Sequence, residues 1–258
     1  MNEKQLEMLL LALAILVANT AEAAATTDYC KLHASHTLCV HKGEGAACTG
    51  GLLGRGVKPA EAKEIVRLHN KLRSRIAHGE EPLGSPGPQP SSSNMLQMVW
   101  DNELAMIAQS HADQCVFKHD CYTCRRTSRY SITGQNLFLR GGTGSATEMD
   151  MEQAVGRAFY GEVANFNRHA VLRFGSFKSP GMVGHYTQLV WAKTYRVGCG
   201  FSRWKVGKWT KMLLTCNYAP GGNTVTVPIY KVGAACSDCP QGSTCSSQFP
   251  GLCSKGEG

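Results

Sequence analysis

The chain has 258 residues, a formal net charge of +8 and 12 cysteines. Its basic balance suits anionic surfaces or partners, but no block of lysine and arginine with interleaved aromatic residues occurs, so nucleic acid is not expected as a partner. All of the cysteines lie after residue 29, and an even number of them is typical of a disulfide-bonded secreted protein.

The first 23 residues predict a secretory signal peptide. Residues 8–18 form an unbroken apolar run that is too short to span a hydrocarbon core as a helix. Ala21 and Ala23 flank Glu22 in the A-x-A pattern of a cleavage site. We therefore expect cleavage after Ala23, an extracellular protein and no membrane span.

Two regions follow the leader. Residues 24–57 are rich in glycine and cysteine without a helical period, which indicates an N-terminal arm held by disulfides. Residues 58–77 predict a helix that begins at Pro59 and ends before Gly79. Its apolar residues recur on one face: Ile65, Leu68, Leu72 and Ile76.

Two more helices are expected. Asp101 can cap the first, whose inner side is formed by Leu104, Ile107, Ala108, His111 and Cys115. The second is expected to begin near Ser145, where Ser145 and Glu148 match a capping box. Glu162 projects from the apolar stripe of that helix, which consists of Val155, Phe159 and Phe166.

Three segments in the last third are rich in β-branched and aromatic residues and predict strands: 184–191, 197–204 and 209–218. Residues 205–208 supply a turn between the second and third, and a bridge from Cys199 to Cys216 would tie that hairpin. Helices followed by strands predict an α+β fold.

Two cysteine clusters leave alternatives open. Beyond residue 231, Cys236, Cys239, Cys245 and Cys253 lie in a tail that is too short to fold without cross-links. Four thiolates could hold zinc, but an oxidising compartment favours two disulfides. Cys121 and Cys124 have the spacing of a redox pair, but no strand-then-helix context surrounds them, which favours a structural bridge.

Three polar residues mark a candidate site. Glu162 on an apolar face and His185 in a strand-like run both need polar partners, and His119 ends the second helical region. Imidazole nitrogens suit zinc or copper, and a carboxylate can orient a ligating ring. The alternative is a hydrogen-bonded cluster that only stabilises a cleft. No zinc-protease, hydrolase or phosphate-loop motif occurs.

Several segments resemble the CAP superfamily, which unites cysteine-rich secretory proteins, antigen five and pathogenesis-related proteins. The segments are GHYTQLVW at 184–191, CNYAPGGN at 216–223, HNKLR at 69–73 and GQNL at 134–137. The arthropod venom-allergen branch is the most similar. The resemblance implies an α-β-α sandwich with a central antiparallel sheet over residues 58–231, between the arm at 24–57 and a hinge-like tail at 232–258.

The resemblance also implies a cleft with two histidines and two acidic residues. His119, Glu162 and His185 match three of those positions, while the fourth is Gln135. A glutamine side chain cannot act as a general acid or base and is a poor zinc ligand. A hydrolase that works through two carboxylates is therefore disfavoured, whereas His119 and His185 remain candidate ligands for zinc or copper.

The disulfide pattern comes from the same resemblance. Relatives usually carry a further arm cysteine where this chain has Ala34, and its partner would lie near Cys121 or Cys124. We therefore predict that these two pair with each other. The remaining pairs implied are Cys30–Cys39, Cys48–Cys115, Cys199–Cys216, Cys236–Cys245 and Cys239–Cys253.

The family points to a secreted, monomeric, non-enzymatic venom or salivary allergen that binds a lipid, sterol or other small hydrophobic ligand, or a host target. One alternative is a metal-dependent hydrolase or protease, against which Gln135 and the lack of an activated nucleophile count. Another is an ion-channel modulator, which is disfavoured because the chain stops soon after Cys253.

Overall fold

The computed structural model describes residues 27–143 and 148–256. The predicted signal peptide and the predicted helix start at Ser145 lie outside the described residues. Within those two stretches, no helix combines the length and the apolar character that crossing a bilayer requires.

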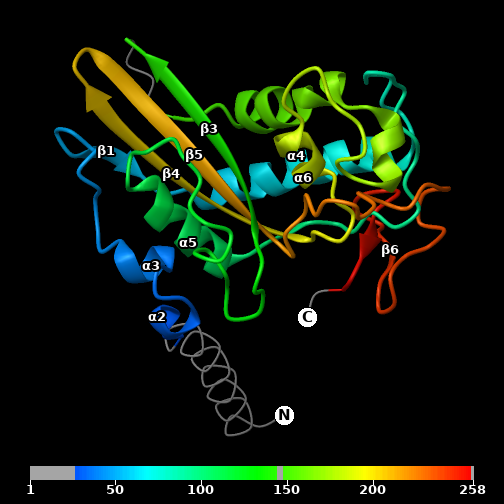
Figure 1. Cartoon of the computed structure of the whole chain (residues 1–258), viewed down its shortest axis with the longest axis horizontal. Helices are drawn as coiled ribbons and strands as arrows, with labels where there is room; N and C mark the ends of the chain where they lie inside the picture. Colours follow the sequence, from blue (N-terminus) through cyan, green and yellow to red (C-terminus); the bar gives the residue numbers. More distant parts are fainter. Residues whose placement is uncertain (1–26, 144–147, 257–258) are drawn as a thin grey trace, which may run out of the picture.

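A twisted sheet forms the middle layer of the fold. Its antiparallel strands follow the order β1 (Leu52–Arg55), β4 (Arg196–Val206), β5 (Trp209–Ala219) and β3 (Gly134–Gly142), and the short β2 (Val99–Trp100) runs parallel to β4. Helix α5 (Asn102–Ala112) covers one face, and α4 (Pro59–Ala77) and α6 (Gly184–Leu189) lie on the other (Figure 1). The expected α-β-α sandwich is confirmed.

Helix α5 lies unusually close to the sheet. The carboxylate of Asp101 caps it by accepting a hydrogen bond from the Leu104 amide at 3.0 Å, as expected. A Cβ built on Gly198 would come within 2.3 Å of the Ala105 nitrogen, and one on Gly200 would come within 2.3 Å of Gln109. Both glycines of β4 thus lack side chains because the helix backbone occupies that space.

The main core lies between the sheet and the helices of the opposite face. Helix α4 spans the predicted residues, and its Ile65, Leu68 and Ile76 are buried. The predicted third helix is a π-helix, η1 (Glu152–Phe159), followed by the 3-10 helices η2 (Tyr160–Asn165) and η3 (Arg168–Leu172). The amide of Tyr160 reaches the carbonyl of Val155, five residues back, which widens the helix where its buried stripe meets the core.

The prediction of a strand at 184–191 is wrong. Residues 184–189 form α6, and both Tyr186 and Leu189 are fully buried. The polar residues between them are buried too, because Thr187 donates to the Val183 carbonyl and Gln188 accepts from the Gly222 amide. Because the last four residues of α6 are all buried, this short helix shows no amphipathic period, and its sequence resembles a strand.

The arm and the tail contain more regular structure than expected. The arm forms two short helices, α2 (Tyr29–Leu32) and α3 (Thr37–Val40), and contributes β1 to the main sheet. Strand β3, which carries Gln135, was not predicted as a strand. The tail holds a small two-stranded sheet, β6 (Thr244–Cys245) with β7 (Cys253–Ser254).

Six disulfides close the fold. Cys121–Cys124 is the pair predicted from the missing arm cysteine, and the other five are the pairs that the resemblance implies: Cys30–Cys39, Cys48–Cys115, Cys199–Cys216, Cys236–Cys245 and Cys239–Cys253. The Cys199–Cys216 bridge joins directly opposite residues of the β4–β5 hairpin. All four tail cysteines are oxidised, so they do not offer the thiolates that a zinc site would need.

Candidate ligand and metal cleft

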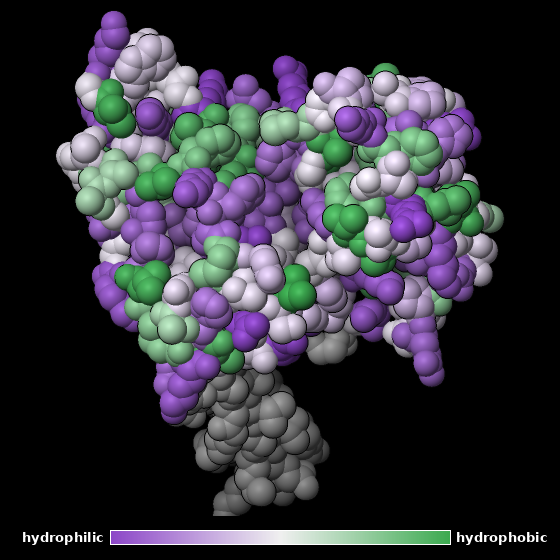
Figure 2. All heavy atoms as spheres, in the orientation of Figure 1, coloured by the Kyte–Doolittle hydropathy of each residue, from purple (hydrophilic) through white to green (hydrophobic). Residues whose placement is uncertain are grey.

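Four residues from different elements line one cavity of about 260 Å³ between the sheet and the helices. His119 comes from the loop after α5, Gln135 from β3, Glu162 from η2 and His185 from α6. On the face shown in Figure 2, the surface is hollowed between the sheet side and the helical side, and hydrophilic residues predominate there. The structure thus brings together all four residues that the sequence singled out.

Glu162 holds His185 in one orientation. One carboxylate oxygen accepts from Nδ1 of His185 at 2.7 Å, and the other accepts from the backbone amides of His185 and Tyr186 at 2.8 and 3.2 Å. The His185 ring stacks on Phe159, with ring centroids 5.1 Å apart. Glu162 is only 9% exposed, so these three donors replace the water that its carboxylate would otherwise bind.

Gln135 orients His119 as Glu162 orients His185. Its Nε2 donates to Oδ1 of Asp120 and to Oδ1 of Asn217, both at 3.2 Å. Because both of those oxygens can only accept, the amide must point its own oxygen at His119, where it lies 2.7 Å from Nδ1. The amide oxygen orients the imidazole as a carboxylate would, without carrying charge.

In the neutral form, both rings therefore carry their proton on Nδ1 and keep a lone pair on Nε2. This is the arrangement of metal-binding histidines, whose other nitrogen donates to a carboxylate or carbonyl. The two Nε2 atoms would supply two of the four ligands that zinc usually takes. Glu162 already accepts three hydrogen bonds, so the remaining ligands would be water or a bound molecule.

Two clusters of side chains with metal-ligand spacing occur in the described residues, and neither contains a residue of the cleft. One contains His33, Cys121 and Cys124, and the other contains Cys236, Cys239 and Cys253. Every cysteine in both is in a disulfide. A disulfide sulfur is not a thiolate, so both clusters lack their metal-binding groups in this state.

A buried series of hydrogen bonds, which was not predicted from the sequence, connects the cleft to α4. Asn136 donates to the backbone carbonyl of His185 at 3.0 Å and to the Tyr218 hydroxyl at 3.4 Å. That hydroxyl donates to Nε2 of His69 at 2.9 Å, and Nδ1 of His69 donates to the Ile65 carbonyl at 2.7 Å. Burial lowers the pKa of His69 to about 4, so its ring is neutral at physiological pH.

A buried arginine fixes the segment that follows α6. Arg73 is fully buried and donates to the carbonyls of five residues: Leu96, Leu189, Trp191, Ala192 and Thr194. Burial lowers the pKa of Arg73 to about 9, which still leaves the guanidinium charged at neutral pH. Two sequence signals pointed to Arg73: its helical spacing from Ile65 and Ile76, and its place in the HNKLR segment at 69–73. Neither was interpreted as a buried arginine.

Two other histidine predictions can be compared with the structure. His111 lies on the inner side of α5, as expected, and both of its ring nitrogens have partners: Nδ1 lies 3.0 Å from the Thr215 hydroxyl, and Nε2 lies 2.9 Å from the Lys118 carbonyl. Burial is the main cause that lowers the pKa of His111. His36 belongs to the arm, where no helical period was found, yet it is buried at the start of α3 and caps that helix by accepting from the Leu38 amide.

A second and larger cavity was not predicted. A groove of about 780 Å³ runs between the start of α4, strand β2 and the tail. Its apolar lining includes Val57, Val66, Met98, Trp100 and Phe249. Lys63 and Arg67 of α4 lie along the same groove. No feature of the sequence joins these segments, which come from three distant parts of the chain.

The comparisons with known proteins assign the family. A sequence model of the cysteine-rich secretory protein family, CAP, matches residues 66–218. The chain belongs to this family. Two relatives are similar over most of both chains. Venom allergen 5 of Dolichovespula arenaria is 40% identical and aligns with 79% of this chain and 98% of its own. Venom allergen 3 homolog of Dinoponera quadriceps is 38% identical, with 84% and 95% covered.

Other CAP relatives are longer than this chain. CRISP/Allergen/PR-1 of Trittame loki is 44% identical over 88% of this chain but only 55% of its own length. This chain thus spans about half of that relative.

Solved CAP structures have the same fold. NaASP2 with Zn2+ superposes with a TM-score of 0.62 at 32% identity, covering 77% of this chain and 97% of that one. BmVAL-1 superposes with a TM-score of 0.65 at 29% identity, covering 81% and 98%. These two structures cover 77% and 81% of this chain, so the likeness extends beyond residues 66–218.

Proposed function

We propose that this chain is a secreted, non-enzymatic protein of the venom-allergen type whose groove beside α4 binds an anionic amphiphile, such as a long-chain fatty acid. Family membership, the predicted leader and the six disulfides support secretion. Within the chain, a CAP domain over 58–231 would carry the function, between the arm and the tail. The groove is the observation that carries the ligand proposal.

The lining of the groove suits a molecule with an apolar chain and one negative charge. Its volume of about 780 Å³ lies in the range of small-molecule sites. Val57, Val66 and Phe249 are partly exposed along it and would lose contact with water when an acyl chain covers them. A headgroup carboxylate would find the ammonium of Lys63, because Arg67 is already paired with Glu64 at 2.7 Å.

Tryptophan fluorescence offers a direct test, because Trp100 lies in the groove, Trp191 and Trp204 are buried, and the exposed Trp209 on β5 does not line the groove. A brominated long-chain fatty acid should quench the fluorescence saturably, and Trp100→Phe should remove most of that quenching. Val66→Glu and Lys63→Glu should each weaken binding about ten-fold or more.

Matched controls separate the groove from the rest of the surface. Leu172 is 63% exposed on η3, and Lys208 is exposed in the β4–β5 turn. Leu172→Glu and Lys208→Glu introduce the same charges away from the groove and should leave binding unchanged. Quenching that is equal in all four variants, or no saturable quenching of the parent protein, would exclude the groove as a fatty-acid site.

The chemistry of the cleft supports a non-enzymatic role. Gln135 cannot transfer a proton, and both oxygens of Glu162 are engaged by donors of its own neighbourhood. Hydrolase and protease assays of the purified protein beside Glu162→Ala and His185→Ala test this. An activity that both substitutions abolish would overturn the non-enzymatic proposal, whereas an activity that survives both does not arise in the cleft.

A second role is favoured by the tautomers of the cleft histidines. With Nδ1 of His119 and His185 engaged as donors, both Nε2 atoms are free to bind a divalent metal, zinc or copper. Titration calorimetry with ZnCl₂ or CuCl₂ should give one site per chain. The variant His119→Ala/His185→Ala should lose it, and His78→Ala, at an exposed histidine on the helix end, should keep it. Binding unchanged in the double variant would place the metal elsewhere.

A further inference from the structure

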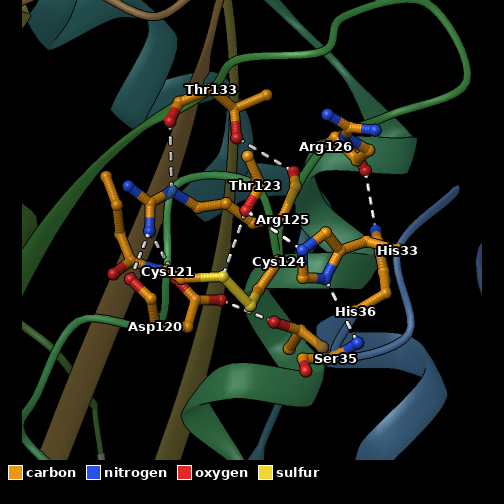
Figure 3. Close-up of a disulfide and its surroundings, with 12 residues drawn as sticks. His33, Ser35, His36, Asp120, Cys121, Thr123, Cys124, Arg125, Arg126 and Thr133 are labelled. Carbon is orange, nitrogen blue, oxygen red and sulfur yellow. Dashed lines mark hydrogen bonds and ion pairs between the residues drawn. A yellow bond between two sulfur atoms is a disulfide. The ribbon is translucent and has the colours of Figure 1, made fainter.

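The Cys121–Cys124 disulfide lies in the loop between α5 and β3, against the N-terminal arm (Figure 3). The two sulfurs differ in access: Cys121 is exposed, whereas Cys124 is 7% exposed. The arm brings His33 beside them, so that a ring nitrogen and the two sulfurs lie within 4.8 Å of one another. An accessible sulfur next to polar side chains is unlike the buried Cys48–Cys115 bridge.

The hydrogen bonds around this disulfide fix where each proton lies. The Thr123 hydroxyl is 3.4 Å from Sγ of Cys121, and a disulfide sulfur carries no hydrogen, so Thr123 is the donor. The Ser35 amide donates to Nδ1 of His33 at 3.1 Å, so the neutral ring has its proton on Nε2. That nitrogen lies 3.4 Å from the Thr123 oxygen and donates to it. Donors thus run in one direction, from His33 through Thr123 to Cys121.

The same series of hydrogen bonds argues against a metal ion bound between His33 and the disulfide. Nε2 of His33 carries a proton and faces Thr123, so it has no lone pair to offer unless the Ser35 hydrogen bond breaks. The hydrogen bonds from His33 through Thr123 instead favour negative charge on Cys121. A thiolate is a stronger acceptor than a disulfide sulfur, so the Thr123 hydroxyl would bind it more tightly. The environment of Cys121 is therefore better matched to the open, thiolate form of the pair.

The loop is also held without the disulfide. The Thr37 amide donates to the Cys124 carbonyl at 2.7 Å, and the Thr37 hydroxyl donates to Asp120 at 2.5 Å. Asp120 pairs with Arg125, whose Nε donates to the Thr133 carbonyl at 3.1 Å. The bridge closes a sequence separation of only 3, against 67 for Cys48–Cys115. A bridge over so short a loop removes little chain entropy, so opening it leaves the fold in place.

We propose that Cys121–Cys124 is a site of thiol–disulfide exchange whose substrates are low-molecular-weight thiols. The thiolate of such a thiol attacks the exposed Sγ of Cys121. The Cys121–Cys124 bond breaks, and Cys124 leaves as a thiolate that takes a proton from water. A second thiolate attacks the small-molecule sulfur of the mixed disulfide and releases Cys121 as a thiolate. Two small thiols are thereby oxidised to one disulfide, and the protein disulfide is reduced to two thiols.

Thr123 and His33 act as positioning residues in this reaction. Thr123 donates to the Cys121 thiolate, and His33 keeps the Thr123 hydroxyl pointed at the sulfur by donating to its oxygen. The Cys30–Cys39 bridge of the arm is a natural internal control. Cys30 is exposed as Cys121 is, but within the described chain no side-chain hydrogen bond reaches either of its sulfurs.

The experiment exposes the native protein to reduced glutathione, traps thiols with an alkylating reagent at timed intervals, and maps the peptides by mass spectrometry. Cys121–Cys124 should open about ten-fold faster than Cys30–Cys39, with the glutathione adduct on Cys121 rather than Cys124. Thr123→Val keeps the shape but removes the donor that stabilises the departing Cys121 thiolate. It should therefore slow the second step, so that the glutathione adduct on Cys121 accumulates about five-fold over the parent, and leave Cys30–Cys39 unchanged.

A second variant keeps the test independent of folding defects. The Cys121→Ser/Cys124→Ser protein should retain the circular dichroism spectrum of the parent and unfold cooperatively, because the arm contacts remain. Opening of Cys30–Cys39 at the same rate as Cys121–Cys124 would overturn the proposal. So would an adduct confined to Cys124, a Cys121 adduct that accumulates no more in Thr123→Val than in the parent, or loss of the folded state in the double serine variant.

Discussion

The side-chain oxygen of Gln135 lies 2.7 Å from Nδ1 of His119, while its nitrogen donates to Oδ1 of Asp120. The two ends of this amide thus face groups of opposite hydrogen-bonding character. A carboxylate could satisfy His119 but would set one of its oxygens against the carboxylate of Asp120. The neighbouring Asp120 therefore gives a physical reason for glutamine at this position of the cleft.

Gln135→Glu should destabilise the protein by about 1–3 kcal/mol at pH 7, since it removes the donor to Asp120 and Asn217 and sets two carboxylates against each other. Urea unfolding followed by fluorescence measures the difference. Gln241→Glu, at an exposed position of the tail, makes the same chemical change without those neighbours and should have little effect. A Gln135→Glu protein as stable as its parent would show that Asp120 does not require a donor there.

Arg73→Met should lower the free energy of unfolding by at least about 3 kcal/mol, because it leaves the buried carbonyls of five residues without their donor. Arg157→Met, at an exposed position of η1, serves as the control, and its free energy of unfolding should stay within about 0.5 kcal/mol of that of the parent. Chemical denaturation of both proteins gives the comparison. Equal losses in the two variants would mean that the buried guanidinium does not hold the segment after α6.

Gly200→Ala should destabilise the fold by roughly 2 kcal/mol or more, because the new methyl group would meet the backbone of α5 at Gln109, 2.3 Å away. Gly141→Ala in β3 is the matched control, since nothing lies within 4 Å of a Cβ at that position. Thermal unfolding of the two variants distinguishes them. If both melt at the temperature of the parent, α5 can move away from the sheet at no cost.

Stability should fall as pH drops from about 6.5 to about 4, because burial lowers the pKa of His69 to about 4 in the folded protein from an ordinary value of 6.5. In that window the unfolded chain binds a proton that the folded chain cannot. The loss from His69 is roughly 3 kcal/mol, and His36 and His111, whose pKa values burial also lowers, act in the same direction.

Urea unfolding at pH 7 and at pH 4.5 measures this loss of stability. In His69→Gln the difference between the two pH values should shrink, since the titrating group is gone while one hydrogen-bonding side chain replaces another. An identical pH dependence in the variant and the parent would mean that His69 does not contribute to it.

The local signals in the sequence were sufficient for three elements. The spacing of Ile65, Leu68 and Ile76 placed α4, the cap at Asp101 placed α5, and the turn before Trp209 placed the β4–β5 hairpin. Each is specified by residues close together in the chain. Strand β3 was not predicted, and helix α6 was predicted as a strand. The conformation of both depends on contacts with segments that are distant in the sequence.

The sequence by itself determined the chemistry available to this protein. The cysteines, the two cleft histidines, Glu162 and the uncharged Gln135 can all be read from it, and the family motifs placed them in one cleft. Only the tertiary structure decided which proton each ring carries and which charges are buried. The carbonyls that bind Arg73 lie 23 to 121 residues away from it along the chain, and no local pattern can encode partners at that distance.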